Sequence, residues 1–301
     1  MMIRSAVTAE YQNLLNVVRN TADAGLRALL MEIMGLPPAQ QREALHDILP
    51  TLGAQYSDMT SEVSTVFFDS LMEMQSVKKP VPSDLLDPMD KKRWHALVGW
   101  GASDTTFDNG GMLLMQQLIT GGMNRILTEV AGDTMIGNAM LQSELMRAQR
   151  VPQPGCCNFC AMLASRFAEY KSAESAGRVV GRGVPVGQGK GHGSFGKGRG
   201  IKTRGTRKLG EKYHDHCRCS IVIVTEDNYA ELQAGAERYY EAYKEAAENV
   251  NSGLTLKVTD ISSETRLKNK YEWVKADGTL TTPKSRTREI VRAMEALNPV
   301  A

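Results

Sequence analysis

Apolar residues recur every three or four positions through the first half of the chain, which is the spacing of one helix face. The pattern is clearest over residues 8–34, where the apolar positions are Tyr11, Leu14, Leu15, Val18, Leu26, Leu29, Leu30 and Ile33. The run Gly35-Leu36-Pro37-Pro38 predicts the end of this helix, because proline disrupts a helix interior. For the same reason Pro50 predicts a break between two further helices, at residues 39–49 and 51–74.

More helices are predicted in the rest of the first half. Asp90 is a suitable N-cap for a fourth helix, because its carboxylate can accept hydrogen bonds from free backbone amides. Residues 110–146 predict one or two helices, interrupted at Gly121-Gly122 and at Gly132, since glycine weakens a helix interior. We therefore expect residues 1–150 to form a helical domain.

Strand signals appear in the second half of the chain. Residues 220–224 read Ser-Ile-Val-Ile-Val, a β-branched apolar run that predicts a buried strand. A helix is predicted over residues 228–249. The last 50 residues predict a strand or hairpin, at 254–258 and 271–274, and a final helix over residues 284–297.

All five cysteines and two of the five histidines fall in two short clusters. One is Cys156-Cys157-Asn158-Phe159-Cys160, and the other is His214-Asp215-His216-Cys217-Arg218-Cys219. Thiolates and imidazoles are the usual ligands of zinc, and four protein ligands make a closed, structural Zn²⁺ site. The expected ligands are Cys157, Cys160, His214 and Cys217, with His216 and Cys219 as alternative ligands. A disulfide and a metal-free group of buried thiols are the competing interpretations.

Residues 177–212 differ from the rest of the chain in composition. They contain twelve glycines, ten lysines and arginines and a single acid, Glu211, although the whole chain has a formal net charge of only +2. Such a segment buries too little apolar surface to offset its ordering entropy. A flexible polycation binds DNA through phosphate contacts, so we predict DNA contacts here; an acidic protein surface and bare solvent are the alternatives. The candidates are Arg178, Arg182, Lys190, Lys197, Arg199, Lys202, Arg204, Arg207 and Lys208.

The predicted fold class is α+β and predominantly α-helical. A helical N-terminal domain over residues 1–150 precedes a small zinc-stabilised α+β module over residues 151–225, which the basic glycine-rich loop 177–212 interrupts. Residues 226–301 form a C-terminal extension of a helix and a hairpin. No membrane-spanning helix is expected, because the chain lacks an uninterrupted apolar run of roughly 18 residues.

Catalytic motifs are scarce in this sequence. It contains no G-x-S-x-G nucleophile elbow and no H-E-x-x-H zinc-protease motif. His95 is expected in the core or at an interface, and His46, next to Asp47, is expected to face solvent. A cysteine protease that uses Cys156 and His216 is an alternative with weaker support, and no catalytic residue is assigned.

The two cysteine clusters and their flanks resemble a known family. The run PGCCNFCAMLASR over residues 154–166, followed by YHDHCRC over residues 213–219, resembles the Mu F-type phage head-morphogenesis family, in the minor capsid version of actinobacterial tailed phages. Arg93-Trp94 and residues 147–151 are similar to that version too. The resemblance covers most of residues 1–225, and it maps the family's Cys-x-x-Cys to Cys157 and Cys160 and its His-x-x-Cys-x-Cys to His214, Cys217 and Cys219.

This resemblance implies a minor capsid protein. Such a protein assembles in the host cytoplasm and stays in the capsid interior of the virion near the portal, with the portal protein, the major capsid or scaffold protein and packaged DNA as expected partners. Relatives are often described as capsid maturation proteases, which is the alternative function. The chain departs from the family pattern at Asp215, where proline is usual, and at the additional His216, which leaves the identity of the metal-binding imidazole open.

Overall fold

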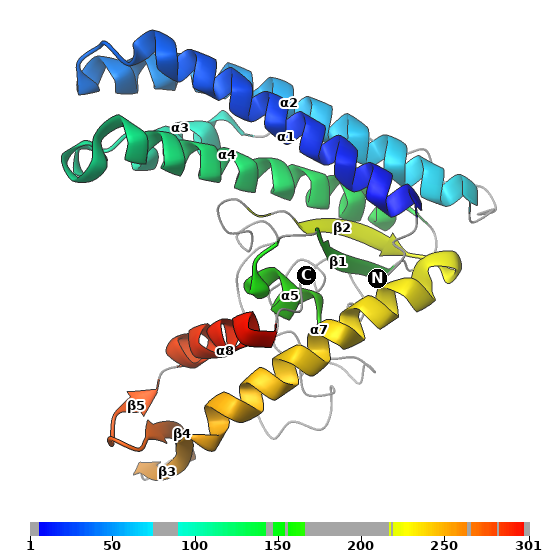
Figure 1. The fold of residues 1–301 in the computed structure, drawn as a ribbon, viewed down its shortest axis with the longest axis vertical. Coiled ribbons are helices and arrows are strands. Elements are labelled where there is room, and N and C mark those ends of the chain that lie inside the picture. The colour runs from blue at the N-terminus through cyan, green and yellow to red at the C-terminus, as the bar shows by residue number, and fades with distance from the viewer. Residues whose placement is uncertain are drawn as a thin grey trace. The chain divides into compact units, whose positions relative to one another are not determined.

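The structure is a computed structural model, and its described residues are predominantly helical (Figure 1). It describes residues 6–74, 90–142, 147–153, 156–165, 217, 219–263, 266–281 and 283–297. Contacts divide the chain into two compact units, which are taken one at a time below. Among the described residues, no helix has the length and apolarity needed to cross a membrane.

The first unit is a bundle of helices with a two-stranded ribbon. Its described elements are α1 (Ala6–Ile33), α2 (Pro38–Met74), α3 (Lys91–Gly101), α4 (Asp104–Leu141), β1 (Arg147–Pro152), β2 (Cys219–Val224) and the start of α7 (Glu226–Ser252). The long helices α1, α2 and α4 run side by side (Figure 1). The apolar face expected over residues 8–34 is largely the buried face of α1, although Leu14 is exposed.

Close packing of α3 against its neighbours depends on glycine. A Cβ atom at Gly53 of α2 would lie 2.4 Å from the ring of Trp94, and one at Gly122 of α4 would lie 2.2 Å from Leu97. Real carbon atoms in contact are about 3.5–4.0 Å apart. The absent side chains therefore let α3 approach both long helices, and Trp94 becomes fully buried.

Three predicted helix breaks are wrong. Pro50 lies inside α2, and Gly121-Gly122 and Gly132 lie inside α4. An interior proline costs about 3 kcal/mol of helix stability, but the flanking Leu49 is fully buried in the bundle core, so packing outweighs that cost. The non-helical residue of α4 is instead Gly111, at φ 57°.

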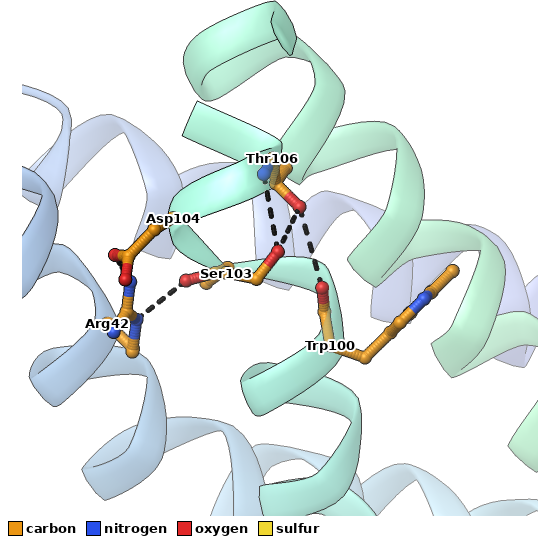
Figure 2. Close-up of polar contacts among 6 residues, drawn as sticks. Arg42, Trp100, Ser103, Asp104 and Thr106 are labelled. Atoms are coloured by element: carbon orange, nitrogen blue, oxygen red, sulfur yellow. Dashed lines mark hydrogen bonds and ion pairs between the residues drawn. The ribbon is translucent and has the colours of Figure 1, made fainter. Parts of the chain in front are cut away.

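Polar contacts fix the turn between α3 and α4 (Figure 2). The side chain of Ser103 caps α4 by accepting a hydrogen bond of 3.2 Å from the backbone amide of Thr106. Arg42 of α2 donates through Nε to the carbonyl oxygen of Ala102 at 2.7 Å, and its guanidinium forms an ion pair with Asp104. These contacts tie the α3–α4 turn to α2. Asp90 caps α3 as predicted, accepting from the backbone amide of Lys92.

The ribbon of β1 and β2 is antiparallel, with Pro152 opposite Cys219 and Arg147 opposite Val224. The predicted strand 220–224 is confirmed, whereas β1 was not predicted. The β1 sequence, RAQRVP, has no alternating apolar pattern, so its strand conformation depends on pairing with β2. Apolar side chains of β2 join the core formed by α1, α2 and α4.

The second unit contains α5 (Asn158–Ala164), most of α7, β3 (Leu254–Ser263), β4 (Arg266–Lys275), β5 (Leu280–Thr281) and α8 (Pro283–Leu297). The predicted helix over 228–249, the hairpin and the final helix are all present. Lys275 and Glu289 form an ion pair of 2.8 Å that links β4 to α8. These contact-based units have boundaries other than those of the three expected domains, which remain a prediction about independent folding.

Candidate metal centre

Cys217 precedes β2 by two residues, and the side chains of Cys217 and Cys219 are both buried. Cys219 is the first residue of β2 and pairs with Pro152. The ribbon register therefore determines where its sulfur lies.

A buried hydrogen-bond chain connects Cys217 to the helical bundle. The hydroxyl of Thr128 lies 3.0 Å from the carbonyl oxygen of Cys217 and 2.8 Å from that of Asn124, and it donates its one hydrogen to these acceptors. Arg19 of α1 donates to the same hydroxyl at 3.1 Å. Because α1 and α4 both take part, the backbone at Cys217 is held by two long helices.

A second buried contact fixes the ribbon itself. The side-chain amide of Gln12 on α1 donates to Ser220 Oγ at 2.8 Å and to the carbonyl oxygen of Val151 at 3.3 Å. Val151 and Ser220 are partners across the ribbon. A one-residue slip of β2 would break this contact and turn the cysteine to the other face.

The first cysteine cluster surrounds the beginning of α5. Cys157 is the N-cap residue and is exposed, while Cys156 and Cys160 are buried. The backbone amide of Cys160 donates to the carbonyl oxygen of Cys157 at 2.9 Å, closing the first turn. Residues three apart on a helix are neighbours on its surface, as the Cys-x-x-Cys motif requires for shared ligation.

The sulfur atoms of Cys160, Cys217 and Cys219 all lie within 4.8 Å of one another, and all three side chains are buried. Two thiolates on one tetrahedral zinc ion are about 3.8 Å apart, because a Zn–S bond is about 2.3 Å long. The three cysteines are therefore close enough to hold a metal ion after small side-chain movements. No disulfide joins any of the five cysteines in the structure.

The structure brings together only some of the predicted ligands. Cys160 and Cys217 belong to the group, and so does Cys219, which the sequence indicated only as an alternative ligand. Cys157 is exposed, and both His214 and His216 lie outside the described residues, so the full ligand set stays a prediction. The spacing of Cys217 and Cys219, two residues apart just before the predicted strand, was the sequence signal for including Cys219.

The nine basic candidates for DNA contacts, Arg178, Arg182, Lys190, Lys197, Arg199, Lys202, Arg204, Arg207 and Lys208, also lie outside the described residues. Elsewhere, His46 and His95 contact each other across α2 and α3. His95 is exposed, so its predicted position in the core is wrong, while a position at an interface stays a prediction.

Comparison with known proteins identifies a protein family. The family model described as "VG15 protein" matches residues 2–246, well over half of the chain. No curated protein and no solved structure matches.

Proposed function

The chain belongs to the VG15 protein family, a family of phage proteins, and from this membership we propose that it is a minor capsid protein of a tailed phage. In this role it enters the prohead during assembly in the host cytoplasm and stays inside the virion near the portal. The family match over most of the chain is the observation that carries the proposal. The likeness of the cysteine motifs to Mu F-type proteins supports the more specific role.

The helical bundle would provide the contact with the portal, the major capsid protein or the scaffold protein. Exposed apolar side chains on its long helices support this role, among them Val17 and Met31 on α1 and Val66 on α2. Apolar side chains at a surface become stabilising only when a partner removes them from water. The long, continuously packed helices would present them on a rigid support.

We further propose that a structural Zn²⁺ ion is bound by Cys160, Cys217 and Cys219, with an imidazole of His214 or His216 as the fourth ligand. The short separation and burial of the three sulfurs support this assignment. Cys157 is the alternative thiol, as the family pattern implies. Four protein ligands leave no position for water, so the ion would stabilise the fold and take no part in catalysis.

Metal analysis of the purified full-length chain tests the zinc assignment. We expect one zinc ion per chain, lost in Cys160→Ser and Cys217→Ser and retained in the matched control Cys156→Ser, whose thiol lies outside the group of three. If zinc is retained in Cys219→Ser but lost in Cys157→Ser, the third thiol ligand is Cys157 and not Cys219. Zinc-free protein with unchanged circular dichroism and unchanged resistance to urea would refute a structural ion.

The basic loop, residues 177–212, would bind packaged DNA without sequence preference. Its composition supports this role, because each phosphate neutralised by lysine or arginine releases counterions. Retention on a DNA column at low salt should fall when residues 181–208 are deleted. A matched variant that keeps the length but changes the nine basic residues to glutamine separates charge from loop length. Equal retention of all three proteins would refute the DNA role.

The decisive experiment reconstitutes assembly. Purified chain, portal, scaffold and capsid proteins are mixed, and proheads are isolated and analysed by quantitative mass spectrometry. The minor capsid role predicts uncleaved chain present in a few copies per prohead, with co-purification dependent on the portal. Specific cleavage of scaffold or capsid protein that is abolished by Cys156→Ser would instead establish the maturation protease.

A further inference from the structure

Two histidines from separate helices meet on the surface of the helical bundle. The Nδ1 atom of His46 on α2 lies 3.2 Å from the Nδ1 atom of His95 on α3. The ring centroids are 5.4 Å apart and the ring planes are tilted by 33°. The two residues are 49 positions apart in the sequence, so tertiary packing creates this pair.

We propose that His46 and His95 form a second metal site, which takes a divalent late transition-metal ion through the two Nδ1 atoms. Metal–imidazole bonds of about 2.0–2.1 Å place neighbouring nitrogens about 3.3–3.4 Å apart in a tetrahedron and about 2.8–3.0 Å apart in an octahedron. The separation of 3.2 Å lies between these two values. Both nitrogens can therefore reach one ion with little movement of either helix.

The backbone positions of both histidines are held by contacts of neighbouring residues. Arg42 lies one helical turn before His46 and ties α2 to the α3–α4 turn through Ala102 and Asp104 (Figure 2). Trp94, next to His95 in the chain, packs directly on Gly53 of α2. A site whose ligands are held before binding loses less entropy when the ion arrives.

Exposure also favours an ion at this site. His95 is exposed, so water can complete the coordination shell and exchange with a further ligand. The positive charge of Arg42 is compensated by Asp104.

The competing explanation is a hydrogen bond between the two imidazoles, one donating and one accepting. Such a bond also holds two ring nitrogens about 3 Å apart. It differs from a metal site in a measurable way, because it gives no affinity for added metal. Imidazole ligands suit nickel and copper, which bind nitrogen ligands more tightly than most divalent ions do.

Isothermal titration of the full chain with Ni²⁺, after any cysteine-bound zinc has been loaded, tests the proposal. We expect one Ni²⁺ per chain beyond the zinc, with affinity at least about tenfold lower in His46→Ala and in His95→Ala, since each loses one of two ligands. His192→Ala is the matched control and should bind as the wild type does. Pulsed electron paramagnetic resonance of the Cu²⁺-loaded chain should show two coordinated imidazoles.

Two results would overturn the site. One is wild-type protein that binds no Ni²⁺ beyond the zinc, which leaves the hydrogen bond alone as the explanation. The other is an unchanged Ni²⁺ affinity in His95→Ala, which would mean that other residues bind the ion. His95→Gln is a second, conservative variant, and circular dichroism verifies that each variant folds. The zinc content of all three variants should be unchanged, so the outcome is independent of the cysteine centre.

Discussion

The contact between Gly53 and Trp94 supports a quantitative prediction for Gly53→Ala. The added methyl carbon would lie 2.4, 2.5 and 2.6 Å from three atoms of the fully buried indole ring. Overpacking in a core costs about 1–3 kcal/mol, and a rigid ring on a packed helix puts this case near 3. Alanine gains about 1 kcal/mol over glycine in a helix interior. The net loss in the free energy of unfolding should be about 2 kcal/mol.

Gly99→Ala is the matched control for this substitution. Gly99 lies in α3 like Trp94, but a Cβ atom there meets nothing within 4 Å. Only the helix-propensity term remains, so the free energy of unfolding should rise by about 0.5–1 kcal/mol. Urea unfolding followed by tryptophan fluorescence measures both variants. Stabilisation of Gly53→Ala to the same extent as Gly99→Ala would refute the close approach of α3 to α2.

Three further predictions concern buried polar contacts. Arg93→Met removes the bidentate ion pair to the buried Glu129 carboxylate and should lower the free energy of unfolding by about 2 kcal/mol. This loss is smaller than for a fully buried pair, because Arg93 is partly exposed. Wild-type resistance of the variant to urea would contradict the prediction. Burial raises the pKa of Tyr11 to about 12, so between pH of about 10 and 12 the unfolded chain loses a proton that the folded chain keeps, and stability falls. Tyr11→Phe should lose less stability across that window in urea titrations at each pH, and an equal loss would assign the effect elsewhere. Thr128→Val removes the hydroxyl that donates to the carbonyl oxygen of Cys217. It should lower the free energy of unfolding by about 1 kcal/mol and speed the release of zinc to a chelator. Wild-type stability and a wild-type release rate would show that this contact does not hold the second cysteine cluster.

Helices and the β2 strand were predictable because their signals are local. The three-to-four spacing of apolar residues over residues 8–34 is a property of neighbours in the sequence, and α1 follows it. The β-branched run over residues 220–224 predicted β2 in the same way. The β1 strand was not predicted, because its residues do not favour a strand by themselves. They adopt the strand conformation by pairing with β2.

The chemistry of the candidate sites was visible in part. The two cysteine clusters stand out in the sequence by their spacing alone, and their thiols indicate a metal site. The place of Cys219 in the group of three came only from the structure, in which its sulfur lies within 4.8 Å of those of Cys160 and Cys217. The pair of His46 and His95 had no sequence signal, because its two members are on different helices and 49 residues apart.

The sequence by itself therefore determined which segments are helical, where the buried strand lies and which side chains can bind metal, since each of these depends on residue type and short-range spacing. Only the tertiary structure decided that α2 continues through Pro50, that α4 continues through Gly122 and that His46 meets His95. For the two helices, a local penalty of about 1–3 kcal/mol for proline or glycine is outweighed by packing against residues far away in the chain. The two histidines lie on different helices, so their contact also depends on packing between distant segments. A local sequence pattern contains no information about such packing.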